Sequence, residues 1–202
     1  MFILAKMIKA AYRNHGFVGA IVYGKQGYGK SSYALKTAFQ VYGDWGQVFD
    51  SLVSKLEDLL DILKQSISKG DRRILIIWDD AGVHGNKYKW FEYNGQETAK
   101  QLQALMDVIR TGLAALIFTT PQPNELLKVF RGYDFYYIKI TKQDKKNTRL
   151  ATIYQQNVMP NGSILVKKIG FDRFNVMLPD DVYQKYSEIR RSYFIEVINS
   201  FL

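Results

Sequence analysis

Residues 24–31 have types and a spacing that suit the binding of phosphate, in the order G-x-x-x-x-G-K-S. Glycine permits backbone angles that turn successive N–H groups inward, where they form a concave anion site. The helix-forming residues that follow would add the unpaired N–H groups and the positive dipole end of a helix N-terminus. The sequence therefore predicts a site for ATP on Gly24, Lys25, Gln26, Gly27, Tyr28, Gly29, Lys30, Ser31 and Ser32.

Two side chains in this stretch would act directly on the nucleotide. The Lys30 ammonium would reach the β- and γ-phosphates, and the Ser31 hydroxyl would be a ligand of Mg²⁺. The stretch also has the surroundings that such a loop needs, because an apolar, β-branched run precedes it at 18–23 and a helical pattern follows at 32–39. A glycine-rich turn with a chance Lys-Ser pair would not explain those flanking elements.

Two carboxylates end another apolar run. Residues 74–78 are apolar, and Asp79 and Asp80 follow them directly. This order is typical of a central parallel strand whose carboxyl end carries acids. After a phosphate-binding loop, Asp79 would hold the Mg²⁺ shell and Asp80 would orient the attacking water. The alternative is an ordinary strand end at which the two acids form a turn.

Hydroxyl and amide side chains follow a third apolar run, at 113–118. If that strand neighbours the strand of Asp79, then Thr119, Thr120 and Gln122 would lie beside the γ-phosphate. We therefore expect one of them, with Thr120 as first choice, to sense the nucleotide. Simple capping of the strand end is the alternative.

The composition excludes several kinds of site. The chain of 202 residues has no cysteine, which rules out disulfides, thiol catalysis and a cysteine zinc site, and its two histidines make a histidine metal centre unexpected. An apolar content of 47% suffices for a sizeable core. No apolar run reaches the ~18 residues of a membrane span. The lack of cysteine suits a cytoplasmic protein.

Positive charge dominates the sequence, with a net charge of +9. Residues 139–173 contain eight lysines and arginines against two acids, and they have the pattern of a β-hairpin around 160–162. We expect this hairpin to contact the phosphates of DNA, although lysines that protect a solvated edge strand, or that keep the protein soluble, would look the same. A basic, aromatic stretch at 87–93 would either stack on bases or cap the core. The candidate DNA contacts of the hairpin are Lys142, Lys145, Lys146, Arg149, Lys167 and Lys168.

The elements that must position these residues alternate between strand and helix, which predicts an α/β fold with a mostly parallel sheet covered on both faces. We expect a core at 1–141 and, packed on it at 142–202, the basic β-hairpin with a C-terminal helix. The expected strands are 18–23, 74–78, 113–118 and 135–140, with a short one within 48–53 and the paired strands 149–155 and 163–169. The expected helices are 1–14, 32–42, 54–69, 96–111, 124–130 and one that opens at 178–181.

Helices are expected at both ends of the chain. The amphipathic helix at 1–14 packs on the core or, alternatively, lies at a membrane interface. The last helix opens with proline and two acids. Its expected packing face consists of Val182, Tyr186, Ile189, Tyr193 and Phe194.

Several of these motifs together resemble a known family. Arg110-Thr111-Gly112 before the strand at 113–118, and Thr-Thr-Pro-Gln-Pro after it, look like the pattern of HerA/FtsK ATPases, in the additional-strand group of P-loop ATPases. The resemblance covers residues 18–141. It departs from the family at Pro121, which stands where Gln would follow Thr, and at Asp80, where related ATPases have Glu. It implies a three-layer P-loop NTPase core with one strand between the phosphate-loop strand and the Asp79 strand.

The resemblance also implies a function. HerA/FtsK proteins are DNA-pumping motors and include genome-packaging ATPases of archaeal viruses. The implied activity is Mg²⁺-dependent ATP hydrolysis that translocates, packages or transfers DNA, duplex rather than single-stranded, in an archaeal virus or plasmid. It further implies a homo-oligomer, such as a hexameric ring, in which Arg110 or Arg131 reaches a neighbouring subunit's nucleotide. A surface ion pair is the alternative for each arginine.

A second resemblance competes with the first. Asp79-Asp80-Ala81-Gly82 is similar to the Asp-Asp-x-Gly of AAA+ helicase loaders, and 126–134 is similar to the AAA+ segment that ends in an arginine finger. It implies an ATP-switched loader or scaffold with a viral or replication protein as partner. The assembly ATPases of filamentous phage are related to the HerA/FtsK proteins and are a further alternative. A small-molecule kinase is the last alternative, and it would leave the basic hairpin without a role.

Overall fold

Seven strands form one sheet in the computed structural model, which describes residues 1–81, 95–126, 128–131, 133–143, 146–159, 161 and 163–199. Their order is β2-β3-β4-β1-β5-β6-β7; β6 and β7 are antiparallel to their neighbours and all other pairs are parallel. The predicted α/β class with a mostly parallel sheet is confirmed. The strands are β1 (Val18–Tyr23), β2 (Leu52–Val53), β3 (Ile76–Trp78), β4 (Ala115–Thr120), β5 (Tyr136–Lys142), β6 (Thr148–Val158) and β7 (Ile164–Asn175).

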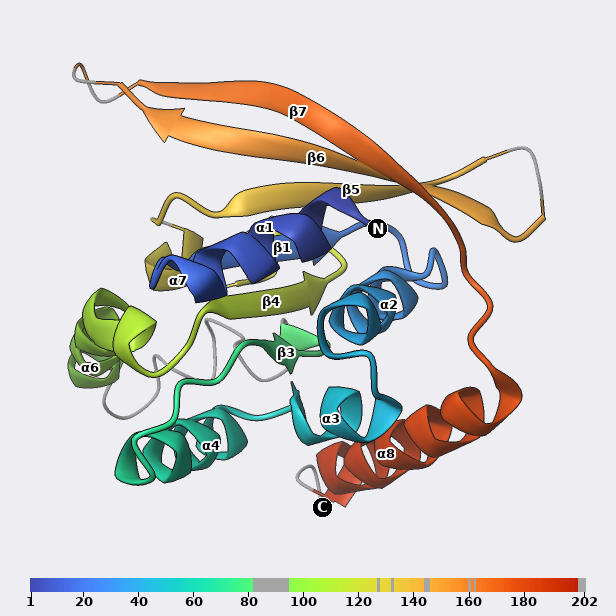
Figure 1. Ribbon diagram of the computed structural model, residues 1–202, viewed down its shortest axis with the longest axis horizontal. Coiled ribbons are helices and arrows are strands. Elements are labelled where there is room, and N and C mark those ends of the chain that lie inside the picture. Colours follow the sequence, from blue (N-terminus) through green and yellow to red (C-terminus); the bar gives the residue numbers. More distant parts are fainter. Residues whose placement is uncertain are drawn as a thin grey trace.

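Helices cover both faces of the sheet (Figure 1). They are α1 (Ile3–Arg13), α2 (Lys30–Tyr42), α3 (Trp45–Asp50), α4 (Leu56–Ser68), α6 (Gly95–Val108), α7 (Lys128–Arg131) and α8 (Asp180–Asn199), with 3-10 turns η1 (Ile109–Thr111) and η2 (Pro123–Glu125). Residues of α1, α2, α3 and α8 share one buried cluster, and residues of α4, α6 and α7 share another.

Alternate residues of the central strands supply the two clusters. Ala20, Val22 and Ile77 belong to the cluster under α1 and α2, whereas Ile21 and Ile76 belong to the opposite one. Side chains of a strand alternate between faces, so a strand covered on both sides is apolar throughout. The continuous apolar runs of the sequence are explained by this three-layer arrangement.

The short strand predicted within 48–53 is wrong in its first half. Residues Trp45–Asp50 form α3, because the Asp44 carboxylate caps this helix by accepting a hydrogen bond of 2.8 Å from the Gln47 N–H. Only Leu52–Val53 pair with β3 as β2. Apolar residues in so short a segment fit a helix turn as well as a strand, and the cap decides between them.

One carboxylate of β7 fastens two helices to the sheet. Asp172 is buried and accepts hydrogen bonds from the Ile3 N–H, at 2.9 and 3.1 Å, and from the Tyr33 hydroxyl of α2, at 2.7 Å. Burial, followed by the Asp172 charge, raises the pKa of Tyr33. Leu4 and Ile8 of α1 are fully buried in the core. The core-packing interpretation of the N-terminal helix is therefore confirmed.

The β6–β7 hairpin extends along the sheet and projects beyond it (Figure 1). The pairing shifts between Ile153 and Tyr154, so that β7 has one extra residue, Ile169, opposite this step. Such a bulge bends a strand and increases its twist. Phe174 is buried on the inner half of β7, whereas residues 164–169 are exposed. The hairpin is longer than predicted, because β7 continues through residues 170–175, where Asp172 and Phe174 are buried, and β6 extends to Val158.

Among the described residues, no helix combines the length and the apolar character that crossing a membrane requires.

We expect Asp172→Ala to destabilise the fold by about 2–3 kcal/mol, because it leaves the buried Tyr33 hydroxyl and the half-buried Ile3 N–H without this acceptor. Urea unfolding followed by circular dichroism measures this loss. Asp134→Ala makes the same chemical change at an exposed position and is expected to stay within about 0.5 kcal/mol of the wild type. Equal effects of the two substitutions would contradict the structural role of Asp172.

Candidate nucleotide site

The phosphate loop joins β1 to α2 through glycines with left-handed backbone angles. Gly24 has φ 149° and Gly29 has φ 89°, and Gly29 is the N-cap of α2. A Cβ at Gly24 would lie 2.7 Å from the carbonyl oxygen of Ile140, and one at Gly29 would lie 2.4 Å from Cγ2 of Val176. No other residue fits either position, so the glycine spacing of the motif is required by this backbone.

Lys30 is a buried cation at the start of α2. Its side chain is 7% exposed, and Nζ donates to the carbonyl of Lys25 at 3.4 Å. Burial lowers the pKa of Lys30, while the charges of Asp80 and Asp79 raise it. Bound phosphate would add further negative charge and favour the ammonium form. The position therefore suits an anionic ligand.

Asp79 is the centre of a hydrogen-bond network at the carboxyl end of β3. Its Oδ1 accepts from the Ser31 hydroxyl at 2.8 Å and from the Thr119 hydroxyl at 2.6 Å. Its Oδ2 accepts from the Tyr186 hydroxyl at 2.7 Å. The carboxylate is 5% exposed, and three elements, α2, β4 and α8, supply its donors.

The two residues predicted to bind Mg²⁺, Ser31 and Asp79, thus lie in direct contact although 48 positions separate them. A hydroxyl and a carboxylate are hard oxygen donors, as Mg²⁺ prefers. The described residues contain no group of three or more acids, histidines or cysteines that would hold a metal by themselves. This donor set fits an ion that keeps water and phosphate oxygens as its other ligands.

Asp80 is held in a left-handed conformation, with φ 48°. Its N–H donates to the Thr119 hydroxyl at 2.8 Å, and its carboxylate forms an ion pair with Arg190. Burial and the neighbouring Asp79 charge raise the pKa of Asp80, and Arg190 and Lys30 oppose this effect. Thr119 therefore bridges the two acids, as donor to one and acceptor from the other.

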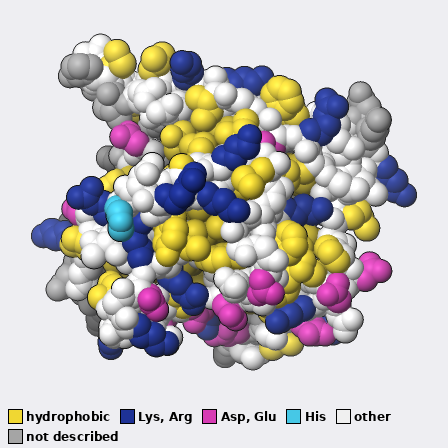
Figure 2. All heavy atoms as spheres, viewed as in Figure 1, with side chains coloured by type: hydrophobic (Ala, Val, Ile, Leu, Met, Phe, Trp, Pro, Cys, Tyr) yellow, Lys and Arg dark blue, Asp and Glu magenta, His cyan; other side chains and the backbone are white. Residues whose placement is uncertain are grey.

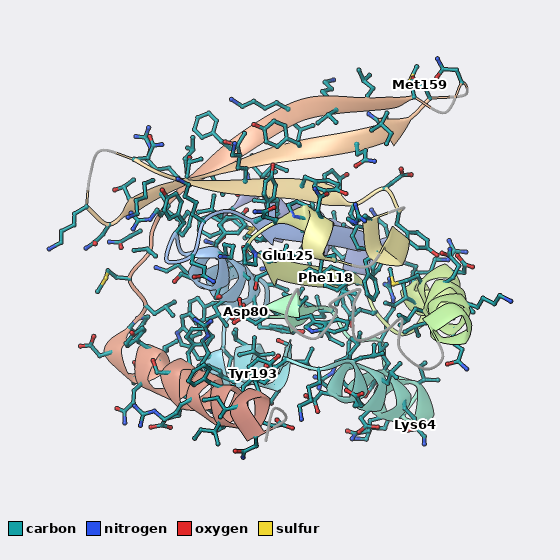
Figure 3. All side chains as sticks on the ribbon, turned by 180° about the vertical axis from the view of Figure 1, so that it is seen from behind. Lys64, Asp80, Phe118, Glu125, Met159 and Tyr193 are labelled. Atoms are coloured by element: carbon teal, nitrogen blue, oxygen red, sulfur yellow. The ribbon has the colours of Figure 1, made fainter. Side chains whose placement is uncertain are left out.

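Strand β4 lies between β1 and β3 and pairs with β3, the strand that leads to Asp79. Its polar carboxyl end therefore borders the site, as we predicted for the case in which these two strands are neighbours. Thr120, our first choice as a sensor, has its hydroxyl 3.0 Å from both the carbonyl of Gln122 and Oε2 of Glu125. Asp80 and Glu125 lie near the same end of the central strands (Figure 3). The Glu125 charge also contributes to raising the pKa of Lys30. Sequence reasoning missed Glu125, although it is the first acid after β4.

Two residues of α8, Tyr186 and Arg190, were also missed. Tyr186 was expected only to pack on the core, and Phe194, expected on the same face, is 63% exposed. The Arg190 guanidinium lies 5.8 Å from the centre of the Tyr186 ring, one helical turn away. The spacing of four residues places them on one face, but nothing in the sequence relates that face to Asp79 and Asp80.

The two candidate finger arginines lie outside this cluster. Arg110 is exposed in η1, before the amino end of β4, and its carbonyl accepts from Arg72 Nε at 2.8 Å. Arg131 ends α7, and its Nε donates to the carbonyl of Leu126 at 3.0 Å. Within one chain, therefore, neither arginine joins Lys30 and Asp79.

The basic residues of the hairpin segment divide into exposed and buried ones. Lys142, Lys146, Lys167 and Lys168 are exposed, and Figure 2 shows lysine and arginine side chains interspersed with hydrophobic ones across this face. Lys145 and the basic, aromatic stretch at 87–93 lie outside the described residues.

Arg149 differs from our prediction of an exposed DNA contact. It is 6% exposed, and its Nη1 donates to the carbonyls of Lys146 and Thr148 at 3.0 Å each. Its Cγ lies 3.9 Å from the place that a Cβ on Gly29 would occupy. Arg149 therefore supports the turn before β6 beside the phosphate loop, and burial removes it from a DNA-binding surface.

Comparison with solved structures finds distant likenesses. The N-terminal domain of zonular occludens toxin from Neisseria meningitidis matches 83% of this chain and 97% of its own, with 12% identity and a TM-score of 0.45. Flagellar accessory protein FlaH from Methanocaldococcus jannaschii matches 81% of this chain and 94% of its own, with 16% identity and a TM-score of 0.40. No family model matches the sequence.

Two viral proteins are similar in sequence. ORF286 of Acidianus two-tailed virus is 34% identical over 77% of this chain, which spans 54% of that protein. B-251 of Sulfolobus spindle-shape virus 1 is 34% identical over 94% of this chain and 80% of its own length. The chain has a P-loop NTPase fold, and it belongs to the family of the Sulfolobus spindle-shape virus 1 protein B-251.

Proposed function

We propose that the chain is a Mg²⁺-dependent ATPase that binds ATP on residues 24–32 and hydrolyses it to ADP and phosphate. The observation that carries the proposal is the hydrogen bond between Ser31 and Asp79 beside the buried Lys30 ammonium. A glycine-rich turn without a nucleotide has no need of a buried cation, a strand-end acid and a hydroxyl at one place.

In this proposal the loop amides and Lys30 bind the β- and γ-phosphates and stabilise the charge that develops on them. Ser31 and Asp79 would hold Mg²⁺, which draws charge from the phosphate oxygens when it is bound. The Asp80 carboxylate accepts a hydrogen bond from the attacking water, whose oxygen forms a bond to the γ-phosphorus as the bond to the bridging oxygen breaks. Thr119 keeps Asp79 and Asp80 in fixed relation throughout.

We further propose that the ATPase acts on duplex DNA, by translocation, packaging or transfer, as a homo-oligomer such as a hexameric ring. The net charge of +9 and the exposed lysines of the outer hairpin support binding to a polyanion. The related sequences come from two viruses, which supports a viral role. In a ring, the exposed Arg110, or else Arg131, would serve the neighbouring subunit's site.

A second candidate function is an ATP-switched loader or scaffold that turns over slowly and has a viral or replication protein as partner. The ion pair between Arg190 and Asp80 favours it, because an acid engaged in this way is less able to orient water. Stimulation of hydrolysis by duplex DNA would separate the motor from the loader.

Lys30→Ala is expected to reduce kcat/KM for ATP by about 100-fold or more, because it removes a fixed positive charge from the phosphates. A phosphate-release assay with Mg²⁺ measures this rate. Lys64→Ala removes an exposed lysine of α4, away from Asp80 (Figure 3), and should leave the rate unchanged. Wild-type rates in Lys30→Ala would refute the assignment of the site.

The double substitution Lys167→Glu with Lys168→Glu is expected to weaken binding of duplex DNA and to reduce the slope of log K against log salt by about 2. Fluorescence anisotropy at several salt concentrations measures both quantities. Lys64→Glu with Lys69→Glu makes the same charge change at two exposed lysines, one in α4 and one at its C-cap, and controls for net charge. If the two double variants bind DNA equally, the hairpin is not the contact surface.

A further inference from the structure

Helix α8 reaches the candidate site from the far end of the chain. The chain leaves β7 at the carboxyl edge of the parallel strands and passes α2 before α8 begins (Figure 1). Tyr186 and Arg190, one turn apart, then bind Asp79 and Asp80, the two acids at the end of β3. Two of the groups most important for the proposed function are thus engaged by one helix.

The contacts of α8 use carboxylate oxygens that the proposed chemistry also needs. Ser31 and Thr119 both donate to Oδ1 of Asp79, and Tyr186 takes Oδ2. Tyr186 takes one of the acceptor positions of Oδ2, and a Mg²⁺ ion bound at that position would displace its hydroxyl. The ion pair with Arg190 involves Oδ2 of Asp80, the carboxylate that would orient water. The two sets of partners therefore compete for the same atoms.

The ion pair places the Arg190 guanidinium at Asp80, whose charge also acts on the pKa of Lys30 in the proposed phosphate site. The Arg190 charge contributes to lowering the pKa of Lys30, and the charges of Asp80 and Asp79 contribute to raising the pKa of Arg190. A guanidinium presents several N–H donors in one plane and binds phosphate oxygens as readily as a carboxylate. A γ-phosphate beside Lys30 would offer Arg190 an alternative anionic partner.

The attachment of α8 suits a helix that can shift. Val182 and Tyr186 are its buried residues among those described, whereas Phe194, Ile195 and Ile198 are exposed. An ion pair between Lys55 and Glu196 adds a contact at the molecular surface. A helix that buries so little apolar surface is displaced at a lower cost than α2, which lies in the core.

We propose that Tyr186 and Arg190 exchange partners when nucleotide binds: Arg190 moves from Asp80 to the γ-phosphate, and Tyr186 releases Asp79 to the Mg²⁺ shell. The exchange frees both acids for hydrolysis and displaces α8, so that the position of the helix reports whether ATP is bound. This inference rests on the proposed nucleotide site and assigns α8 a role within it.

Binding of fluorescent ATP and ADP analogues to the full chain tests the role of Arg190. We expect Arg190→Ala to lower the preference for Mg·ATP over Mg·ADP by about tenfold, the value of one charge-assisted hydrogen bond, and Arg190→Lys to restore part of it. Arg191→Ala, at the adjacent exposed arginine, is the matched control and should leave the preference unchanged. An unchanged preference in Arg190→Ala would overturn the proposal.

Tyr186→Phe tests the other half of the exchange. It removes the hydroxyl that competes for Asp79 and keeps the ring, so we expect half-saturation of ATP binding at an about threefold lower Mg²⁺ concentration. A higher Mg²⁺ requirement would mean that Tyr186 supports the metal site, which contradicts the exchange. A wild-type chain that binds neither nucleotide would overturn the proposed function together with this inference.

A tether tests whether α8 must move. The chain has no cysteine, so Lys55→Cys with Glu196→Cys creates one pair that a reducible bis-methanethiosulfonate reagent can join. We expect the tethered chain to lose about tenfold or more in Mg·ATP affinity and to recover on reduction, whereas treated single-cysteine variants stay unchanged. If the tethered chain binds Mg·ATP as tightly as the untreated double variant, displacement of α8 is refuted.

Discussion

A negative charge buried at the end of β3 must be satisfied by hydrogen bonds, and much of this architecture follows from that requirement. Asp79 accepts from Ser31, Thr119 and Tyr186, which lie 48, 40 and 107 positions away in the chain. Helix α2, strand β4 and helix α8 therefore meet at one carboxylate. The same oxygens that satisfy the charge are the ones that could serve a metal ion.

The order of the strands explains why Thr119 is central to the site. Because β4 lies between β1 and β3, the phosphate loop and the acids are separated by the width of one strand. Phe118 pairs with Trp78, so the next residue of β4 borders Asp79 directly. A hydroxyl at this position can donate to one acid and accept from the backbone of the next, which an apolar side chain cannot do.

The sequence predicted those elements in which the local residue pattern favours the same structure as the tertiary contacts do. Strand β1, the phosphate loop and the end of α2 before Gly43 follow from apolar runs and glycine geometry. The helix α3 was missed because a side-chain cap outweighed a short apolar run. Arg149 and Arg190 could not be placed, since their roles depend on tertiary contacts between segments far apart in the chain, and charge alone suggests a surface.

The extra residue at Ile169 divides β7 into an inner part that packs on the core and an outer part that does not. On the inner part, Asp172 and Phe174 are buried and tied to the helices and the core. From Ile164 to Ile169, the residues of β7 are exposed to solvent on both faces of the strand. Lysines at 167 and 168 can therefore be gained, lost or reversed in sign over generations while the folded domain keeps its stability, so this exposed surface is able to diversify independently of the P-loop core.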